Sequence, residues 1–421
     1  MPQCISHPVI RPNLWLALSR LLCLELGIFL GGTGLHAEDD PVPAPAAKEQ
    51  EKTTPAELTP EAQLVADELK ATLPADSEAR AMLDAILAGS RLGAGEGWFK
   101  MALSQTRFSW ERISQQYDSD SDGKIDKAEF SGLDDDFMRL DRDGDHAVTA
   151  IDLDWSEHSL TPTPGLMLFF QADRDSNGKL TREEFADLFT SLDVDQQGFL
   201  AIDELRHEFE VPTQRRREER PDAPTPSKLV LGLQRQEIGS LQPGPKLDEP
   251  APDFTLNSLD GLDVRLSNEI GEQPIVLIFG NFTCGPFRSQ SGNIEKLYER
   301  YRDRAKFFLI YVREAHPSDG WWMESNQRVG IDLAQPLDQE QRVTVAQRCQ
   351  SHLQISIPFL VDSTNDVAGT AYSGMPNRLY LIDSEGKITF KNGRGPFGFH
   401  TRELEQALIF LLNDPPAGST E

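Results

Sequence analysis

A cysteine and a histidine at two strand ends are the residues of this sequence best placed for chemistry. Cys284 follows the apolar run PIVLIFGNF and starts a helical segment with Gly285 and Pro286. Unpaired N–H groups and the positive dipole end at a helix start favour a thiolate, which makes Cys284 a candidate nucleophile. His316 lies in EAHPSDGW, after the apolar run KFFLIYV, where a histidine can exchange protons with the same corner. The alternative for each residue is structural: a small buried thiol, or an ordinary strand-end histidine.

The number and positions of the cysteines limit the redox chemistry that is possible. The sequence has four cysteines, and Cys4 and Cys23 fall in a segment expected to be removed. The remaining pair, Cys284 and Cys349, is too few for a disulfide-stapled secreted domain. Cys349 lies on the apolar stripe of a predicted helix, which favours a buried structural thiol. The alternative is a resolving partner for Cys284.

Four acidic segments between residues 118 and 204 repeat a pattern of possible metal ligands. A calcium-binding loop takes oxygen ligands at positions 1, 3, 5, 9 and 12, a carbonyl at position 7 and glycine at position 6. The first segment, DSDSDGKIDKAE, meets every requirement, with Gly123 at the turn and Ile125 where two loops pair through a short β-bridge. Carboxylates this close repel one another without a cation, so a solvated acidic face is the weaker interpretation.

The other three loops fit to different degrees. The third, DRDSNGKLTREE, is nearly as good, whereas the second has His146 for the turn glycine and Asp152 for the long terminal Glu. The fourth has Gln197 as a neutral ligand and Ala201 where a ligand is needed. We expect two good calcium sites and two weaker ones. The candidate ligands, with Lys124 and Lys179 acting through their carbonyls, are Asp118, Asp120, Asp122, Lys124, Asp126 and Glu129; Asp141, Asp143, Asp145 and Asp152; Asp173, Asp175, Asn177, Lys179, Thr181 and Glu184; and Asp193, Asp195, Gln197 and Glu204. These repeats resemble EF-hands.

Composition and segment boundaries predict a multidomain, exported protein. The net charge of -27 argues against nucleic-acid binding, which needs a basic footprint. Residues 1–37 have the pattern of a secretory signal, with cleavage favoured over a membrane anchor, so we expect no transmembrane span afterwards and a secreted, periplasmic or cell-envelope location. The expected order is then a disordered linker over 38–60, a helical lead-in over 61–117, an all-α region of four EF-hand-like repeats over 118–210, a linker over 211–243 and an α/β domain over 244–415.

The C-terminal region is predicted to be a mainly parallel α/β domain that resembles thioredoxin folds. APDFTL, near its start, is the usual entry of thioredoxin-fold peroxidases and reductases, and four apolar runs read as strands. Pro376 precedes the third of these runs. The resemblance makes Pro376 a cis-proline candidate facing the reactive cysteine, although most prolines are trans.

NFTCGPF, EAHPSDGW and GRGPFGFHTRELEQAL together resemble the iodothyronine deiodinase family over roughly residues 251–412. The resemblance implies that Cys284 takes the place of the family's selenocysteine nucleophile. It also implies that His316 is catalytic, with Glu314, Ser318 and Trp321 in the surrounding motif. Arg378 matches the family's substrate-gripping basic residue, with Pro376 beside it. The sequence departs from the family pattern at Phe282, where the family has a cysteine, and at Pro336, where it has a histidine.

These patterns give three functional hypotheses. The first is an exported, calcium-binding thiol oxidoreductase in which Cys284 attacks a halogen or sulfur centre and an external thiol regenerates it. The second is a thiol peroxidase on the same fold, which the flanking Asn281 disfavours because typical peroxiredoxins have Thr there. The third is a non-enzymatic calcium-dependent binding or envelope protein with a thioredoxin-like scaffold.

Overall fold

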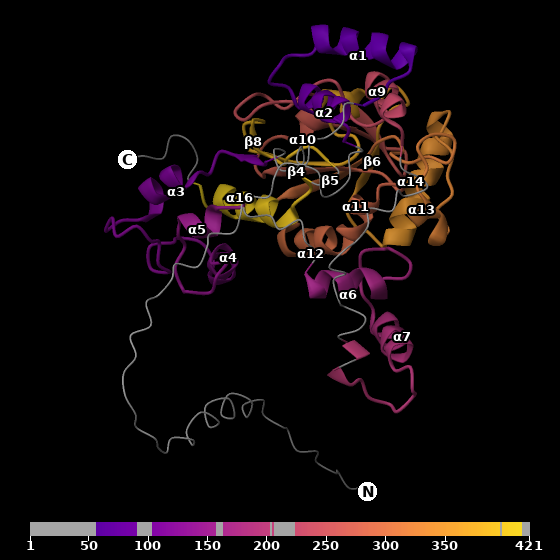
Figure 1. Ribbon diagram of the computed structural model, residues 1–421. Coiled ribbons are helices and arrows are strands. Elements are labelled where there is room, and N and C mark those ends of the chain that lie inside the picture. The colour runs from indigo at the N-terminus through magenta and orange to yellow at the C-terminus, as the bar shows by residue number, and fades with distance from the viewer. Residues whose placement is uncertain are drawn as a thin grey trace, which may run out of the picture. The chain divides into compact units, whose positions relative to one another are not determined.

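The computed structural model describes residues 56–90, 103–156, 163–202, 204–205, 224–395 and 398–414 (Figure 1). All of them belong to one compact unit, Thr53–Glu421. The predicted signal segment, the linker up to residue 55 and most of the predicted second linker lie outside the described residues. Within the described ranges, every helix is too short or too polar to cross a membrane.

Eight strands in the described residues form one sheet in the order β1-β8-β7-β4-β5-β6-β2-β3. Their bounds are β1 (Gln105–Thr106), β2 (Thr255–Ser258), β3 (Asp263–Arg265), β4 (Ile275–Gly280), β5 (Lys306–Tyr311), β6 (Phe359–Val361), β7 (Arg378–Ile382) and β8 (Ile388–Lys391). Only β4, β5 and β6 run parallel to one another; the other pairs are antiparallel. The expectation of a mainly parallel sheet is therefore wrong, because the entry strands and the final hairpin are joined by turns that reverse direction. The central order β8-β7-β4-β5, with a helix leaving the carboxyl end of β4, is the thioredoxin-like arrangement.

Some helices pack against the sheet, and others belong to the N-terminal half of the chain. They are α1 (Pro60–Thr72), α2 (Glu78–Leu87), α3 (Trp110–Tyr117), α4 (Asp134–Leu140), α5 (Ala150–Leu153), α6 (Pro164–Ala172), α7 (Arg182–Leu192), α9 (Pro226–Gln234), α10 (Leu266–Glu269), α11 (Gly285–Ser289), α12 (Ser291–Tyr301), α13 (Glu324–Arg328), α14 (Gln339–Leu353), α15 (Val367–Ala371) and α16 (Thr401–Asn413). Alternate residues of β4 enter two separate apolar cores: Val276 and Ile278 join the larger core with α12, α14 and α16, and Leu277 and Phe279 join the other. The sheet is thus buried on both faces, as its all-buried strands require.

The predicted linker over 211–243 contains a folded element in its described part. Thr225 caps α9 by accepting from the Lys228 N–H, and Pro226 occupies the first turn. Leu229, Val230 and Leu233 of α9 pack into an apolar cluster with α1 and α2 (Figure 1). Part of the linker assignment is therefore wrong, because the Thr-Pro start and the helical spacing of these apolar residues specify a helix.

The four acidic loops share one backbone shape. Positions 4 and 6 of each loop have positive φ, including glycine at position 6 of the first, third and fourth loops. In the second loop His146 takes this left-handed conformation with φ 73°, so the loop keeps its turn without glycine. Ile125 and Val148 exchange both backbone hydrogen bonds at 2.9 Å, which confirms the predicted bridge between the first two loops.

Candidate active site

Cys284 follows the buried strand β4, which ends at Gly280, and is the N-cap residue of α11. Its side chain is fully buried, and its Sγ accepts a hydrogen bond from Asn377 Nδ2 at 3.3 Å. Asn377 follows Pro376, and the Met375–Pro376 peptide bond is cis, as predicted. Asn281 reaches from the β4 end to the same segment, where its Nδ2 donates to the carbonyl oxygen of Pro376 at 2.9 Å. The cis-proline segment and the cysteine therefore form one corner.

Burial opposes ionisation of Cys284 in this conformation. Desolvation raises the pKa of the thiol, although the Phe287 N–H, the Asn377 amide and the Arg288 guanidinium act to lower it. The expectation that the helix start makes Cys284 a thiolate is therefore not met here, because complete burial outweighs the local donors. Access of water or substrate to Cys284 is needed before it can act as a nucleophile.

Glu314 is the centre of a buried hydrogen-bond network. Thr283 donates to Glu314 Oε2 through its N–H at 2.8 Å and its hydroxyl at 2.7 Å, and Tyr311 donates its hydroxyl to Oε1. Burial raises the pKa of Glu314, against the lowering effect of these donors. Because Thr283 directly precedes Cys284, Glu314 positions the cysteine loop through it.

His316 is joined to the cysteine loop through the same threonine. Its backbone N–H donates to Thr283 Oγ1 at 3.0 Å. The imidazole lies edge-on to the Trp321 ring, with ring centroids 4.7 Å apart, and Nδ1 lies 3.1 Å from the Trp321 carbonyl oxygen. Ser318 is on the exposed side of this loop, and its N–H donates to the Leu333 carbonyl. The structure thus brings Cys284, His316, Glu314 and Trp321 to one region, while Ser318 supports the loop.

Arg378, the candidate substrate-binding cation, is fully buried and already paired. It donates from Nη1 and Nη2 to the two carboxylate oxygens of Glu78 at 2.9 and 2.8 Å. Burial acts to lower the pKa of Arg378, but Tyr380 and Glu78 raise it on balance. Glu78 opens α2, 300 residues away in sequence, so its partnership with Arg378 has no local signal in the sequence.

Two further residues of the site lack a sequence signal of their own. Asn377 contacts the Cys284 sulfur, and Arg288 is buried behind it, donating to the carbonyl of Phe282 at 2.6 Å and to Asn326 Oδ1 at 2.8 Å. Their nearness to Pro376 and Cys284 in sequence is the only available hint. Cys349 is a free, fully buried thiol on α14, and burial raises its pKa well above the usual range, which agrees with the structural interpretation.

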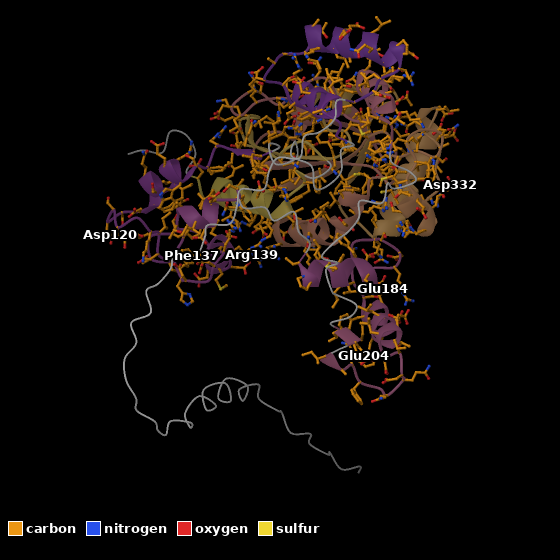
Figure 2. All side chains as sticks on the ribbon, viewed as in Figure 1. Asp120, Phe137, Arg139, Glu184, Glu204 and Asp332 are labelled. Atoms are coloured by element: carbon orange, nitrogen blue, oxygen red, sulfur yellow. The ribbon has the colours of Figure 1, made fainter. Side chains whose placement is uncertain are left out.

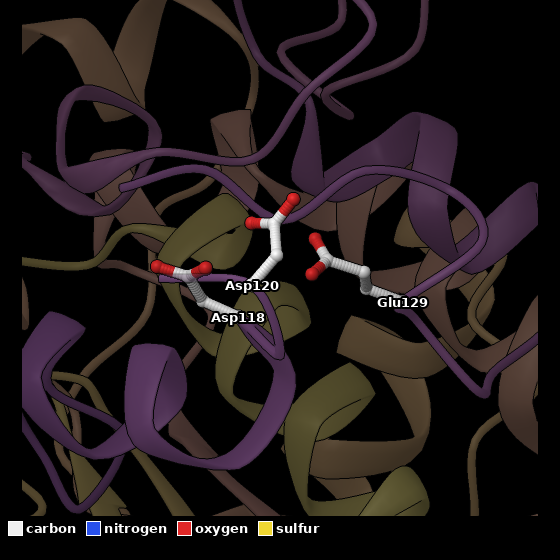
Figure 3. Close-up of side chains that lie close together, drawn as sticks. All are labelled: Asp118, Asp120 and Glu129. Atoms are coloured by element: carbon white, nitrogen blue, oxygen red, sulfur yellow. The ribbon is translucent and has the colours of Figure 1, made fainter. Parts of the chain in front are cut away.

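The acidic loops form four compact carboxylate clusters, in each of which one oxygen per residue lies within 4.8 Å of the others. They are Asp118, Asp120 and Glu129; Asp141, Asp143 and Asp152; Asp173, Asp175 and Glu184; and Asp193, Asp195 and Glu204. Figure 3 shows the first cluster, in which the three carboxylates lie close together. The hard oxygen donors and their spacing fit Ca²⁺, which takes 6–8 oxygens.

The second and third loops hold their acidic residues in different surroundings. In the second loop Asp152 is almost fully buried and accepts from Arg142 N–H at 2.7 Å and Thr149 N–H at 2.8 Å. In the third loop burial raises the pKa of Asp173 to about 6. Figure 2 labels Asp120 in the first loop and Glu184 and Glu204 in the third and fourth.

The fold and the corner around Cys284 define the C-terminal region as a thioredoxin-like domain with a single cysteine at its redox position. Residues 228–410 match the family model of iodothyronine deiodinase. A thyroxine 5-deiodinase of Gallus gallus is 34% identical over 157 residues, covering 37% of this chain and 59% of that protein. A type I iodothyronine deiodinase of Xenopus laevis is 31% identical over 134 residues, covering 32% and 51%. The chain thus spans between half and three fifths of the length of these relatives.

Solved structures of thiol-disulfide proteins are also similar to this chain. The thioredoxin domain of a thiol-disulfide oxidoreductase from Bacteroides vulgatus has 18% identity and a TM-score of 0.28, covering 38% of this chain and 98% of that one. A secreted thiol-disulfide isomerase from Corynebacterium glutamicum has 16% identity and a TM-score of 0.29, covering 39% and 85%. On its own topology and the family match, residues 228–410 form a deiodinase-like domain with a thioredoxin-like fold, a domain type of oxidoreductases.

Proposed function

We propose that this protein is an exported thiol oxidoreductase in which Cys284 attacks a halogen or sulfur centre of a small molecule. The observation that carries the proposal is the corner itself: Asn377 contacts the Cys284 sulfur, and Thr283 joins the cysteine loop to the His316 backbone. The match to the deiodinase family over 228–410 supports the same chemistry. The signal-like pattern of residues 1–37 supports export.

For an iodinated phenol the reaction has two balanced steps. The Cys284 thiolate attacks iodine, the S–I bond forms, the C–I bond breaks, and the ring carbon takes a proton. Two external thiols then reduce the sulfenyl iodide: they form one disulfide, restore the Cys284 thiol and release iodide and a proton. The external thiol is therefore the reductant.

His316 is proposed to exchange the proton. Its Nδ1 lies 3.1 Å from the carbonyl oxygen of Trp321, which can only accept, so a hydrogen bond there uses the tautomer with the hydrogen on Nδ1, and Nε2 is proposed to exchange the proton. Glu314 is proposed to be a positioning residue, because it holds Thr283 rather than the reacting sulfur.

We also propose that the acidic loops bind calcium and thereby stabilise the protein. The support is the ligand spacing of the four loops, their shared backbone shape and the carboxylate clusters. For an exported protein, dissociation constants on the order of 10⁻⁴–10⁻³ M are sufficient. The first and third loops carry the better ligand sets.

The decisive experiment compares the wild-type protein with Cys284→Ser, using Cys349→Ser as a matched control for loss of a buried thiol. Iodide release from iodinated phenols is measured with dithiothreitol, in calcium and in chelator. We expect turnover in the wild type and in Cys349→Ser and none in Cys284→Ser. A rate that is unchanged in Cys284→Ser contradicts the proposal.

The same proteins also test the second hypothesis, which is a thiol peroxidase on this fold. Peroxide and a small disulfide replace the iodinated phenol, and consumption of each is followed. A Cys284-dependent rate with peroxide alone identifies a thiol peroxidase on this scaffold. If no substrate gives a Cys284-dependent rate, the non-enzymatic, calcium-dependent binding role is the one that remains.

A further inference from the structure

Arg288 is a buried cation one helical turn after Cys284. Its backbone N–H donates to the Cys284 carbonyl oxygen at 3.1 Å, which places the two residues on the same side of the first turn of α11. The Arg288 side chain is 3% exposed, and the Cys284 side chain is fully buried. The guanidinium and the sulfur are therefore both enclosed in the interior around this turn.

Two neutral oxygens hold the Arg288 guanidinium against the loop that precedes Cys284. Nη1 donates to the carbonyl oxygen of Phe282 at 2.6 Å, and Nη2 donates to Oδ1 of Asn326 at 2.8 Å. Asn326, in α13, is itself 3% exposed, and its Nδ2 donates to the Thr283 carbonyl oxygen at 2.9 Å. The guanidinium is thus fixed beside residues 282 and 283, directly before the cysteine.

The positive charge of Arg288 has no carboxylate partner among the described residues. Two other buried arginines do have one: Arg342 pairs with Asp366 at 2.8 Å, and Arg378 pairs with Glu78 at 2.8 Å. The two hydrogen-bond acceptors of Arg288 are neutral, and its Nε has no hydrogen-bond partner in the described part of the chain. Because a buried cation is costly unless an anion compensates it, this charge calls for a nearby anion.

Burial lowers the pKa of Arg288, and four nearby groups that can become negative oppose that effect: Cys284, Cys349, Glu314 and Asp173. Three of them are poorly suited to be its partner. Glu314 is held by the hydroxyl and N–H donors of Thr283 and Tyr311. Asp173 accepts from two N–H groups of its own loop. Burial raises the pKa of the Cys349 thiol well above its usual range.

Cys284 is the group that remains, and its surroundings favour an ionised sulfur at this position. Asn377 donates to the sulfur at 3.3 Å. Arg288, from the same turn, acts to lower the pKa of the thiol and is the cation with the strongest effect on it among the described residues. Burial and Glu314, from the loop after β5, act to raise that pKa. Arg288 therefore offsets part of the cost of ionising a buried thiol.

We propose that Arg288 is a positioning residue of the active site, whose guanidinium, held by Asn326, is the counter-ion of the Cys284 thiolate. When Cys284 loses its proton, the guanidinium and the sulfur become an ion pair, and the interior no longer holds an uncompensated charge. This inference rests on the proposed function for the use of the thiolate, but its test does not measure turnover.

The test follows iodoacetamide alkylation of Cys284 against pH by peptide mass spectrometry. Iodoacetamide reacts with the thiolate, so the rate rises with pH to a plateau. Access to the sulfur sets the height of the plateau, and the pKa of the thiol sets the midpoint. Arg288→Met removes the charge. Arg348→Met is the matched control, because Arg348 is exposed and lies over the Phe282 ring of the same loop, with its guanidinium carbon 5.7 Å from the ring centroid.

We expect the midpoint to move to higher pH by about one unit or more in Arg288→Met, so that alkylation at pH 7 slows roughly tenfold. Arg348→Met should keep the wild-type midpoint. A changed plateau with an unchanged midpoint in Arg288→Met means that Arg288 only packs the loop, and it overturns the proposal. An equal shift in both variants also overturns it.

A second variant keeps the proposal testable if Arg288→Met does not fold. Asn326→Asp keeps the shape of the side chain and places a carboxylate on the guanidinium, which competes with the sulfur for its charge. Asn293→Asp adds the same charge on the exposed face of α12 as a control. We expect a higher Cys284 midpoint in Asn326→Asp than in Asn293→Asp, and equal midpoints overturn the proposal. Absence of turnover with iodinated phenols would leave these midpoints unaffected, so the two proposals fail separately.

Discussion

The two pairs of acidic loops have similar sequences but are built into the molecule differently. Ile125, Val148, Phe130 and Phe137 of the first pair belong to the large core that also contains Cys284. Phe130 joins that core through Tyr117, which packs against Phe410 of α16. The first pair is therefore part of the same hydrophobic unit as the redox domain.

The second pair has only a small core of its own in the described residues, made of Ala172, Leu188 and Leu192. It meets the redox domain through its third loop. The carbonyl of Asn177 accepts from the Ser291 hydroxyl, and Lys179 donates to the Gln354 carbonyl at 2.7 Å. The first contact lies at the start of α12, shortly after Cys284 in the sequence, and the second lies at the end of α14.

Repeats of one motif are thus packed in two different ways in the same molecule. The first pair shares the main core, so a change in its conformation would disturb that core. The second pair can loosen locally, because its apolar contacts are few and mostly internal. A signal from calcium to the cysteine helix would therefore pass through the third loop.

A substitution in the shared core should cost the most stability. Phe130→Ala should lower the free energy of unfolding of the whole protein by about 3–5 kcal/mol, because it removes a buried aromatic ring from the main core. Leu188→Ala, the matched change in the second pair, should leave the main transition nearly unchanged. Urea unfolding followed by tryptophan fluorescence measures both. Equal losses in the two variants would mean that the pairs are not built differently.

Alanine substitutions at two glycines test whether the third loop packs against the redox domain. Gly178 and Gly123 occupy the same loop position with φ of 75° and 85°, so alanine strains both backbones alike. At Gly178 an added Cβ would also meet the Arg288 carbonyl and Ser291 Oγ, whereas at Gly123 nothing lies within 4 Å. We expect Gly178→Ala to be about 1–3 kcal/mol more destabilising than Gly123→Ala in thermal unfolding. A difference below experimental error would contradict the docking.

Calcium binding to the two pairs of loops should slow hydrogen exchange in different parts of the protein. At ten times the dissociation constant, each occupied loop adds about 1.4 kcal/mol to the free energy of unfolding. Hydrogen exchange with calcium and with chelator should show slower exchange at the start of α12 when the third loop is occupied. Asp173→Asn should abolish that change at α12, and Asp118→Asn should not. No shift in melting temperature against the chelator control would remove the calcium proposal altogether.

The smallest effect concerns one side chain. Lys179→Met should lower the free energy of unfolding by about 0.5–1.5 kcal/mol, because its ammonium group donates to the Gln354 carbonyl. Lys124→Met is the control, since Lys124 occupies the same position in the first loop and is exposed. Differential scanning fluorimetry of the pair checks this. If Lys124→Met costs as much, the Gln354 contact contributes nothing specific.

Local patterns predicted the parts of the structure that depend on local interactions. The strand ending at Cys284, the bridge at Ile125 and the cis bond before Pro376 all follow from short sequence patterns or from the family resemblance. The start of α9 at Thr225 and Pro226 also had a local signal, but the charged residues before it made the whole stretch look like a linker. Local signals are dependable where the stabilising partner is a few residues away.

Long-range contacts explain what the sequence did not predict. The pairing of Glu78 with Arg378 joins two residues 300 positions apart, and no periodicity encodes such a contact. The state of Cys284 shows the same limit. A helix start favours the thiolate, but packing from distant segments buries the sulfur completely and reverses the balance.

The two-residue strand β1 has a practical consequence for anyone who shortens this protein. Gln105 and Thr106 pair with Lys391 and Phe390, so β1 covers one edge of the sheet. A chain trimmed to begin at residue 228, where the family match starts, would leave β8 with a bare row of N–H and C=O groups. Such an edge recruits other chains, so the trimmed protein should be prone to aggregation. Recombinant work on the redox domain is best done with residues 103–117 retained.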